Sequence, residues 1–232
     1  MISPEILENR QYVSGGLQQP YLVLKNALIP EVAEALYQEL SGITDWVRED
    51  QEAIREVTDK AAVRQADEYR FKRNYIDLNS DDAPPHMRAL CAYLRSRECL
   101  DWISDVSGRV SNHFRGRAAY FDAGDNISHH NDYYVHHTDD NKTIARTVTF
   151  NYYLTRDWKE EWGGNFVWEK PYKKIVPAFN TLVMFLVGPG SMHHVDPVVT
   201  EAAMKRLAIT GWFLSIRDSD KVRRELDLGY IK

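Results

Sequence analysis

The feature that most constrains the fold of this chain is a series of short strand-like runs that begins near residue 115. Each run alternates apolar and polar residues or is apolar throughout, and turn residues such as AGDN and GPG separate neighbouring runs. The longest apolar run, residues 181–187 (TLVMFLV), is typical of a buried strand and is far too short to span a bilayer. Many short strands at close spacing predict an antiparallel sandwich or barrel.

The first half of the chain predicts helices that pack against this β-rich half. A helix is expected to begin at Pro30 and to end at Ser41 and Gly42, because proline suits the first turn of a helix and glycine its end. Two more helices are expected at residues 85–96 and 98–109, and short strands at 20–26 and 71–78. No linker rich in Pro, Gly or Ser is visible, so we predict one α+β domain with its helices packed on one sheet.

Composition and charge exclude several classes of protein. Hydrophobic residues make up 44% of the 232 residues, which excludes wholesale disorder. Lys and Arg total 29 against 34 Asp and Glu, a formal charge of −5, so we expect no nucleic-acid partner, although a local basic groove stays open. The chain has two cysteines with no CxxC pair, and its first residues lack an apolar signal segment. These features predict a cytoplasmic protein with no membrane partner.

Residues 48–73 are densely charged, with both signs of charge mixed. Such a segment is typical of a solvated helix or a mobile loop on the surface. A sharper interpretation is a lid that closes over an active site, because binding and catalytic residues are often carried on loops. The sequence leaves both interpretations open.

The densest chemical signal is the segment SHHNDYYVHH, residues 128–137. On an extended strand, side chains two residues apart share a face, so His130 and Asp132 can bind one metal ion from the same side. Residues 191–197 (SMHHVDP) are the obvious source of a third ligand. Two histidines and one carboxylate on one face of a metal are typical of non-haem Fe(II) enzymes. HxD alone is a weak signal, which a surface turn with a hydrogen-bonded histidine also explains.

Arg206 and Tyr120 are two further candidates. Arg206 opens the apolar run RLAITGWF, thirteen residues after His193, and a guanidinium at the start of a buried strand needs a carboxylate partner. A small dicarboxylate bound in a bidentate manner would suit it, whereas a protein carboxylate or solvent is the plainer partner. Tyr120 precedes His130 by ten residues, and its plainer interpretation is an ordinary core aromatic.

The order of these blocks resembles one known family. The chain carries YFDAGDNISHHND, TVTFNYYLTRDW, GGNFVW, PAFNTLVMF, SMHHVDPV and RLAITGWF in the order and spacing of the prolyl-4-hydroxylase-type branch of the Fe(II)/2-oxoglutarate dioxygenases, and it is most similar to the oxygen-sensing prolyl hydroxylases. The resemblance implies a double-stranded β-helix (jelly roll) as the catalytic core at residues 115–216. Residues 1–114 would then be a helical support region and residues 217–232 a tail of the same domain. It also implies Fe(II), with 2-oxoglutarate and O₂ as co-substrates and ascorbate as an optional addition.

The resemblance also implies roles for individual residues. The family's metal ligands, which are its catalytic residues, fall on His130, Asp132 and His193. His194, the neighbouring alternative to His193, would face away from the metal. The basic residue that pairs with the distal carboxylate of 2-oxoglutarate falls on Arg206. The other co-substrate and pocket positions fall on Tyr153, Tyr120, Trp212, Asn151 and Thr149.

The implied activity is hydroxylation of an unactivated C–H bond with release of succinate and CO₂. Asp132 is present, whereas the family's halogenases lack this carboxylate, so hydroxylation is expected. A protein or peptide side chain such as prolyl is the first choice of substrate, and a free amino acid or small metabolite is the second. The insertion TEAAMK before Arg206 and the polar Asn151 depart from the family's pattern. The sequence leaves the oligomeric state open.

Two other functions are open from the residues alone. One is a zinc hydrolase or lyase that uses the same histidine-rich stretches. The other is a non-enzymatic jelly-roll module that binds a sugar or peptide through aromatic side chains, which make up 12% of the chain. The first alternative gives Arg206 no role, and the second gives none to the three metal ligands.

Overall fold

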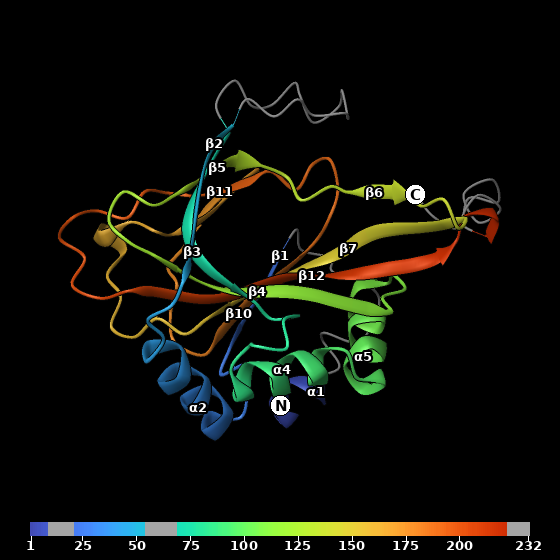
Figure 1. The fold of residues 1–232 in the computed structure, drawn as a ribbon, viewed down its shortest axis with the longest axis horizontal. Helices are drawn as coiled ribbons and strands as arrows, with labels where there is room; N and C mark the ends of the chain where they lie inside the picture. The colour runs from blue at the N-terminus through green and yellow to red at the C-terminus, as the bar shows by residue number, and fades with distance from the viewer. Residues whose placement is uncertain (9–20, 54–68, 222–232) are drawn as a thin grey trace.

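The computed structural model describes residues 1–8, 21–53 and 69–221, which form a curled antiparallel sheet with helices against one layer (Figure 1). The helices are α1 (Pro4–Leu7), α2 (Pro30–Ser41), α4 (Pro85–Leu94) and α5 (Arg97–Ser107), with a 3-10 helix η1 (Glu160–Trp162). The strands are β1 (Tyr21–Lys25), β2 (Val47–Ala53), β3 (Tyr69–Asp77), β4 (His113–Phe121), β5 (Ile127–His130), β6 (Val135–His137), β7 (Lys142–Tyr153), β8 (Phe166–Glu169), β9 (Tyr172–Ile175), β10 (Thr181–Leu186), β11 (His193–Val195) and β12 (Arg206–Asp218).

The strands pair in the order β1-β10-β7-β12-β4-β3-β5-β11-β8-β9, with β2 added to β3 and β6 added to β7. Every pairing is antiparallel. Strand β3 joins two layers, because on the edge opposite β2 it pairs with β4 at residues 74–77 and with β5 at Phe71. The sheet thus folds over itself, with β5 and β11 in the layer opposite β4, β7 and β12 (Figure 1). This confirms the predicted α+β jelly roll.

Two apolar cores explain why residues 181–187 are apolar at every position. Strand β10 lies between them, and its side chains alternate. Leu182 and Met184 belong to the core beneath the helices, whereas Val183 and Phe185 face into the sandwich and pack with Phe166 of β8. A strand that is buried on both faces needs no polar alternation, so the run follows from its position in the middle of the layers.

The predicted helices are present with small shifts at their ends. Helix α2 spans Pro30–Ser41 as expected, and α4 ends two residues before the end of the predicted range 85–96. Helix α5 begins one residue before the predicted range 98–109 and ends two residues before its end. Together α2, α4 and α5 cover one face of the β4–β12–β7–β10 layer (Figure 1). Both cysteines are buried on these helices as free thiols. Among the described residues, no helix combines the length and apolarity that crossing a bilayer requires.

The charged segment 48–73 differs from its predicted form. Residues 48–53 lie in β2 and residues 69–73 lie in β3, which pair along their lengths, so a helix or loop was the wrong prediction for these parts. Charged side chains on both strands account for the pattern, because they pair across them: Arg73 Nε donates to Glu49 at 2.7 Å. Residues 54–68 are outside the described part of the chain, and the lid stays a prediction there.

A close approach between β4 and β12 gives a test of this architecture. A Cβ atom built on Gly211 would lie 2.4 Å from the carbonyl oxygen of Arg115 and 2.7 Å from the ring of Phe114. We expect Gly211→Ala to lower the free energy of unfolding by about 1–3 kcal/mol, because the added methyl group overpacks a core contact. Urea denaturation measures this loss.

Gly190→Ala is the matched control for this substitution, because nothing lies within 4 Å of a Cβ atom at that position. Its free energy of unfolding should stay close to that of the wild type. Equal stabilities of the two variants would contradict the described packing of β4 on β12.

Candidate metal centre and co-substrate pocket

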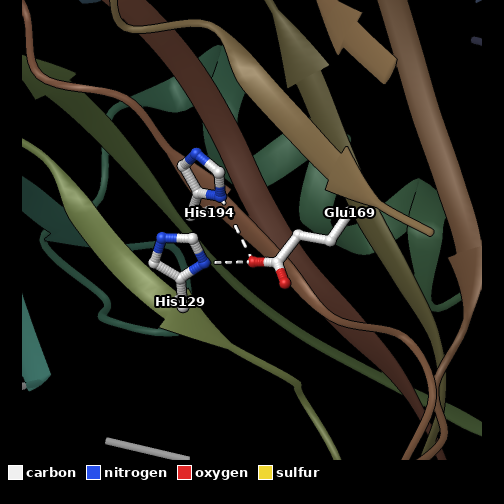
Figure 2. A group of neighbouring side chains, drawn as sticks. All are labelled: His129, Glu169 and His194. Carbon is white, nitrogen blue, oxygen red and sulfur yellow. Dashed lines mark hydrogen bonds and ion pairs between the residues drawn. The ribbon is translucent and has the colours of Figure 1, made fainter. Parts of the chain in front are cut away.

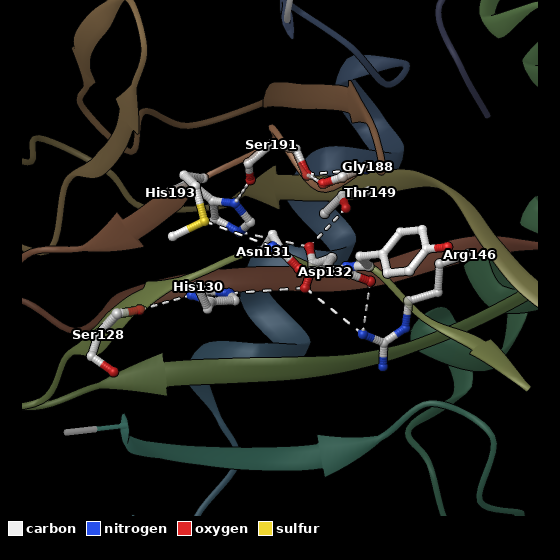
Figure 3. Close-up of polar contacts among 11 residues, drawn as sticks. Ser128, His130, Asn131, Asp132, Arg146, Thr149, Gly188, Ser191 and His193 are labelled. Atoms are coloured by element: carbon white, nitrogen blue, oxygen red, sulfur yellow. Dashed lines mark hydrogen bonds and ion pairs between the residues drawn. The ribbon is translucent and has the colours of Figure 1, made fainter. Parts of the chain in front are cut away.

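His130, Asp132 and His193 form a compact buried cluster between the two layers (Figure 3). His130 ends β5 and pairs directly with His193, which begins β11. Asp132 follows two residues after His130, beyond the end of the strand. Its carboxylate oxygens lie 3.8 Å from Nε2 of His130 and 3.6 Å from Nε2 of His193. The structure therefore brings together the three side chains that the sequence singled out.

Local backbone geometry turns both imidazole rings toward the cluster. The Nδ1 atom of His130 lies 2.8 Å from the carbonyl oxygen of Ser128, and that of His193 lies 2.8 Å from the carbonyl oxygen of Ser191. A carbonyl oxygen only accepts, so each Nδ1 carries a hydrogen and each neutral ring keeps its lone pair on Nε2. Such hydrogen bonds to the outer nitrogen are typical of metal-binding histidines.

Asp132 is held by two residues of β7. Thr149 donates its hydroxyl hydrogen to Oδ2 at 2.8 Å. Arg146 donates to the backbone carbonyl of Asp132 at 3.3 Å and lies 3.9 Å from Oδ1 (Figure 3). The carboxylate is thus oriented from the facing layer of the sandwich, while the two imidazoles come from β5 and β11.

The cluster favours the protonation states that a metal ion needs. Burial and the neighbouring His193 together lower the pKa of His130 to about 3, although Asp132 acts in the opposite direction. Burial alone would raise the pKa of Asp132, but His193, His130, Arg146 and the Thr149 hydroxyl lower it below its ordinary value. A neutral imidazole and an ionised carboxylate are the ligand forms that bind metals. Two such imidazoles and one carboxylate on one side of a metal fit Fe(II) with its other positions open.

Arg206 forms the second part of the site. It begins β12, is only 2% exposed, and donates through Nε to the carbonyl oxygen of Gly164. Its guanidinium carbon lies 4.4 Å from the ring centre of Phe121 and 5.3 Å from that of Tyr153. Within the described residues, no carboxylate oxygen lies within 4 Å of this cation. The protein carboxylate that could have paired with Arg206 is therefore not found in that part of the chain.

Arg206 and Tyr153 are both buried away from solvent. Burial lowers the pKa of the Arg206 guanidinium, and it raises the pKa of Tyr153 to about 12, so at neutral pH the tyrosine is an uncharged donor. Asp196 and the hydrogen-bonded Tyr153 oppose this effect of burial on the pKa of Arg206, but neither is an ion-pair partner in contact with the guanidinium, for which a bidentate carboxylate is the best partner. The pocket thus fits one end of a small dicarboxylate.

Strand β7 links the metal cluster to Arg206. Thr149, Asn151 and Tyr153 alternate along it and are all buried. Thr149 contacts Asp132 at one end, and Tyr153 contacts Arg206 at the other. On the neighbouring strand, Trp212 lies opposite Thr149, with the Arg146 guanidinium 3.7 Å from its ring centre. The structure thus places Thr149, Asn151, Tyr153 and Trp212 along one path between the metal cluster and Arg206, and their roles stay predictions.

Tyr120 is not brought to this pocket, which corrects the prediction for this residue. It pairs with Leu207, the residue after Arg206, and so faces the side of the layer opposite to the guanidinium. There its ring packs 4.9 Å from that of Trp46, against the helix-side core. The adjacent Phe121 lies under Arg206 instead. Tyr120 is therefore a partly buried aromatic that packs against the core, which is close to its plainer interpretation.

Sequence reasoning also missed Arg146 and Gly164. Arg146 sits at an ordinary polar position of a strand, and only the fold reveals its contact with Asp132. Gly164 had a visible signal in the pair Gly163-Gly164. Its backbone adopts φ +63°, and a Cβ atom there would lie 2.7 Å from Cδ of Arg206. Glycine is thus needed both for the backbone conformation and for the close approach to the guanidinium.

Comparison with known proteins shows what the β-rich half of the chain is similar to. Residues 116–214 match the family model described as the 2OG-Fe(II) oxygenase superfamily. This stretch of the β-rich half is thus similar to the 2OG-Fe(II) oxygenases, in line with the resemblance seen in the sequence. Its fold is similar to a Pseudomonas putida prolyl-4-hydroxylase, with a TM-score of 0.58 and 18% identity over 90% of this chain and 98% of that one.

Two further proteins that are similar to this chain are also named as prolyl hydroxylases. The chain is 29% identical over 161 residues to the mouse prolyl 3-hydroxylase OGFOD1. The matched region covers 62% of this chain and 28% of the mouse protein. The chain thus spans little more than a quarter of the length of that relative. The fold is also similar to a Trichoplax adhaerens prolyl hydroxylase solved with a peptide fragment of hypoxia inducible factor, with a TM-score of 0.57 and 21% identity over 88% of this chain and 86% of that one.

The buried His130 gives a testable dependence of stability on pH. In the unfolded chain His130 protonates near its ordinary pKa of 6.5, whereas in the folded, metal-free protein it does so only near 3. The unfolded state therefore binds more protons between these values, and the stability that a neutral His130 contributes above pH 6.5 is lost as the pH falls through this window. The stability advantage of the wild type over His130→Gln should shrink by roughly 1–2 kcal/mol from pH 7 to pH 5.

Urea unfolding in the presence of a chelator measures this difference. His136→Gln, at an exposed position on β6, is the control and should keep a constant difference from the wild type. A stability difference between wild type and His130→Gln that is independent of pH would contradict the desolvated environment of His130.

Proposed function

We propose that the chain binds Fe(II) through His130, Asp132 and His193 and uses 2-oxoglutarate and O₂ to hydroxylate an unactivated C–H bond. The products besides the hydroxylated substrate are succinate and CO₂. The observation that carries this proposal is the pairing, in one sandwich, of a two-histidine, one-carboxylate cluster with a buried Arg206 that has no carboxylate within 4 Å among the described residues. The described residues would act as a single oxygenase domain, with the helices supporting the sheet.

The chain's own residues would position the reactants. When bound, Fe(II) with 2-oxoglutarate supplies the oxidation. Arg206 would bind the distal carboxylate of 2-oxoglutarate, with a hydrogen bond from the Tyr153 hydroxyl. Thr149 and Arg146 would hold the Asp132 carboxylate in place and ionised. The dry wall around Arg206 would exclude water and so strengthen the ion pair with the co-substrate. Because Asp132 is present, we propose hydroxylation and not halogenation.

A groove beside the metal cluster supports a polypeptide substrate. It has a volume of about 270 Å³, and its walls include the side chains of Arg117, Tyr134, Arg146 and Trp212. Arg146 lines the groove and also contacts Asp132, so one side chain links the groove to the proposed metal ligands. Tyr133, Tyr134 and Val135 are exposed at consecutive positions there. A run of exposed apolar side chains is typical of a surface that binds another chain.

The polypeptide side chain that we propose first is prolyl, in line with the names of the two hydroxylase relatives. A free amino acid or small metabolite is the alternative. A mass gain of one oxygen atom in peptides, and not in free amino acids, would separate the two. Formation of succinate from 2-oxoglutarate would distinguish either kind of hydroxylase from a zinc hydrolase and from a non-enzymatic binding module, because neither of these forms succinate.

Removal of the carboxylate ligand tests the proposed activity. Asp132→Ala should lower Fe(II)-dependent succinate formation from 2-oxoglutarate at least roughly 100-fold, because two imidazoles alone hold the metal weakly. Asp101→Ala, at an exposed position on α5, is the matched control and should keep full activity. Undiminished succinate formation by Asp132→Ala would rule out the proposed metal centre.

Removal of the buried cation tests the co-substrate pocket separately. Arg206→Gln should raise the concentration of 2-oxoglutarate needed for half-maximal succinate formation by roughly 10- to 100-fold, because a charge-assisted pair is lost. Binding of Fe(II) itself should stay within a few-fold of wild type.

Arg97→Gln, at an almost fully exposed arginine on α5, is the control and should leave this concentration unchanged. An unaltered 2-oxoglutarate requirement in a folded Arg206→Gln protein would assign Arg206 a purely structural role.

A further inference from the structure

A second cluster of side chains that could bind a metal lies on the outer surface of the layer formed by β5, β11 and β8. It consists of His129, Glu169 and His194, whose ligand atoms lie within 4.8 Å of one another (Figure 2). The three residues come from β5, β8 and β11, which are neighbours in the sheet. No role is given to this cluster by the proposed oxygenase activity.

This cluster shares strands β5 and β11 with His130 and His193, but it lies on their opposite face. His129 precedes His130 on β5, and His194 follows His193 on β11. Because side chains alternate along a strand, two inward imidazoles leave their neighbours pointing outward. The pairing of His193 with His130 therefore brings His129 and His194 together as well, with ring centres 4.2 Å apart.

Glu169 completes the cluster with one carboxylate oxygen. The Nδ1 atoms of His129 and His194 both approach its Oε1, that of His194 at 3.3 Å (Figure 2). The backbone N–H of Glu169 donates to the carbonyl oxygen of Met192, which fixes the end of β8 beside β11. Within the described residues, no Lys or Arg side chain lies within 4 Å of this carboxylate. Its partners there are the two imidazoles.

We propose that His129, Glu169 and His194 form a second divalent-metal site that takes zinc(II). Two imidazole nitrogens and one carboxylate oxygen are a common donor set for zinc, with a fourth position left for water. Mg²⁺ and Ca²⁺ prefer all-oxygen sites and are excluded by the two imidazoles. The exposed His129 side chain gives a metal ion direct access from solvent. This site is independent of iron binding by the inner cluster.

Zinc at this position would also act on the inner cluster. It would connect β5 to β11 from outside, at the residues next to His130 and His193. Strand β11 has only three residues, so an added link at His194 fixes a large part of it. Zinc bound at the outer site should therefore raise the thermal stability of the protein even when the inner ligands are substituted.

Zinc stoichiometry of the full chain tests the proposal. The chelator-treated wild type should bind two zinc ions, one at each cluster, as read by calorimetry and by metal analysis after gel filtration. His129→Ala and Asp132→Ala should each bind one, and the double variant none. Glu169→Gln should weaken the outer site roughly 10- to 100-fold. His136→Ala, at an exposed histidine on β6, is the control and should still bind two.

The outcomes separate this proposal from the proposed function. If His129→Ala binds as much zinc as the wild type, the outer site is overturned, whatever the inner cluster does. If the wild type binds one zinc ion that His129→Ala loses and Asp132→Ala keeps, the outer site stands and the inner cluster fails as a metal centre. Zinc-induced stabilisation of Asp132→Ala but not of the double variant would support the outer site by a second measurement.

Discussion

The antiparallel pairing of β5 with β11 is the constraint on which the whole site depends. It sets His193 opposite His130, although a long stretch of chain separates the two residues. On each strand the histidine Nδ1 binds the carbonyl oxygen two residues before it, so the two strands orient their rings in the same way. Asp132 is held by Thr149 from the other layer of the sandwich. The cluster is therefore complete only when both layers have packed together.

Arg206 illustrates how a fold can tolerate a buried charge. Its cost is partly offset by the carbonyl of Gly164 and by the faces of Phe121 and Tyr153. None of these carries a full negative charge, so the guanidinium is left short of its best partner. A dianionic ligand at this position would complete the electrostatics of the core, and its binding free energy would add to the stability of the folded state.

The sequence predicted the parts of the structure that local patterns determine. The buried run of β10 and helix α2 follow from periodicity and end signals, whereas the inward face of β7 was expected from the family resemblance. A local sequence pattern does not show which strand a given strand pairs with, and this explains the wrong predictions at β2 and Tyr120. The charge pattern of β2 indicated a solvated segment because its strand pairing with β3 is invisible in the sequence. Tyr120 and Phe121 are adjacent, and only the register of β4 against β12 decides which one meets Arg206.

The doubled histidines have a consequence for strand register. A slip by one residue reverses the face to which every side chain of a strand points. On β5 and β11 such a slip would exchange His129 for His130 and His194 for His193, and two imidazoles would still face inward. Asp132 would turn outward in the same shift, and the neighbouring Asn131 would supply only a neutral amide in its place. The acidic residue, and not the histidine pair, thus distinguishes the productive alignment of these strands from its nearest competitor.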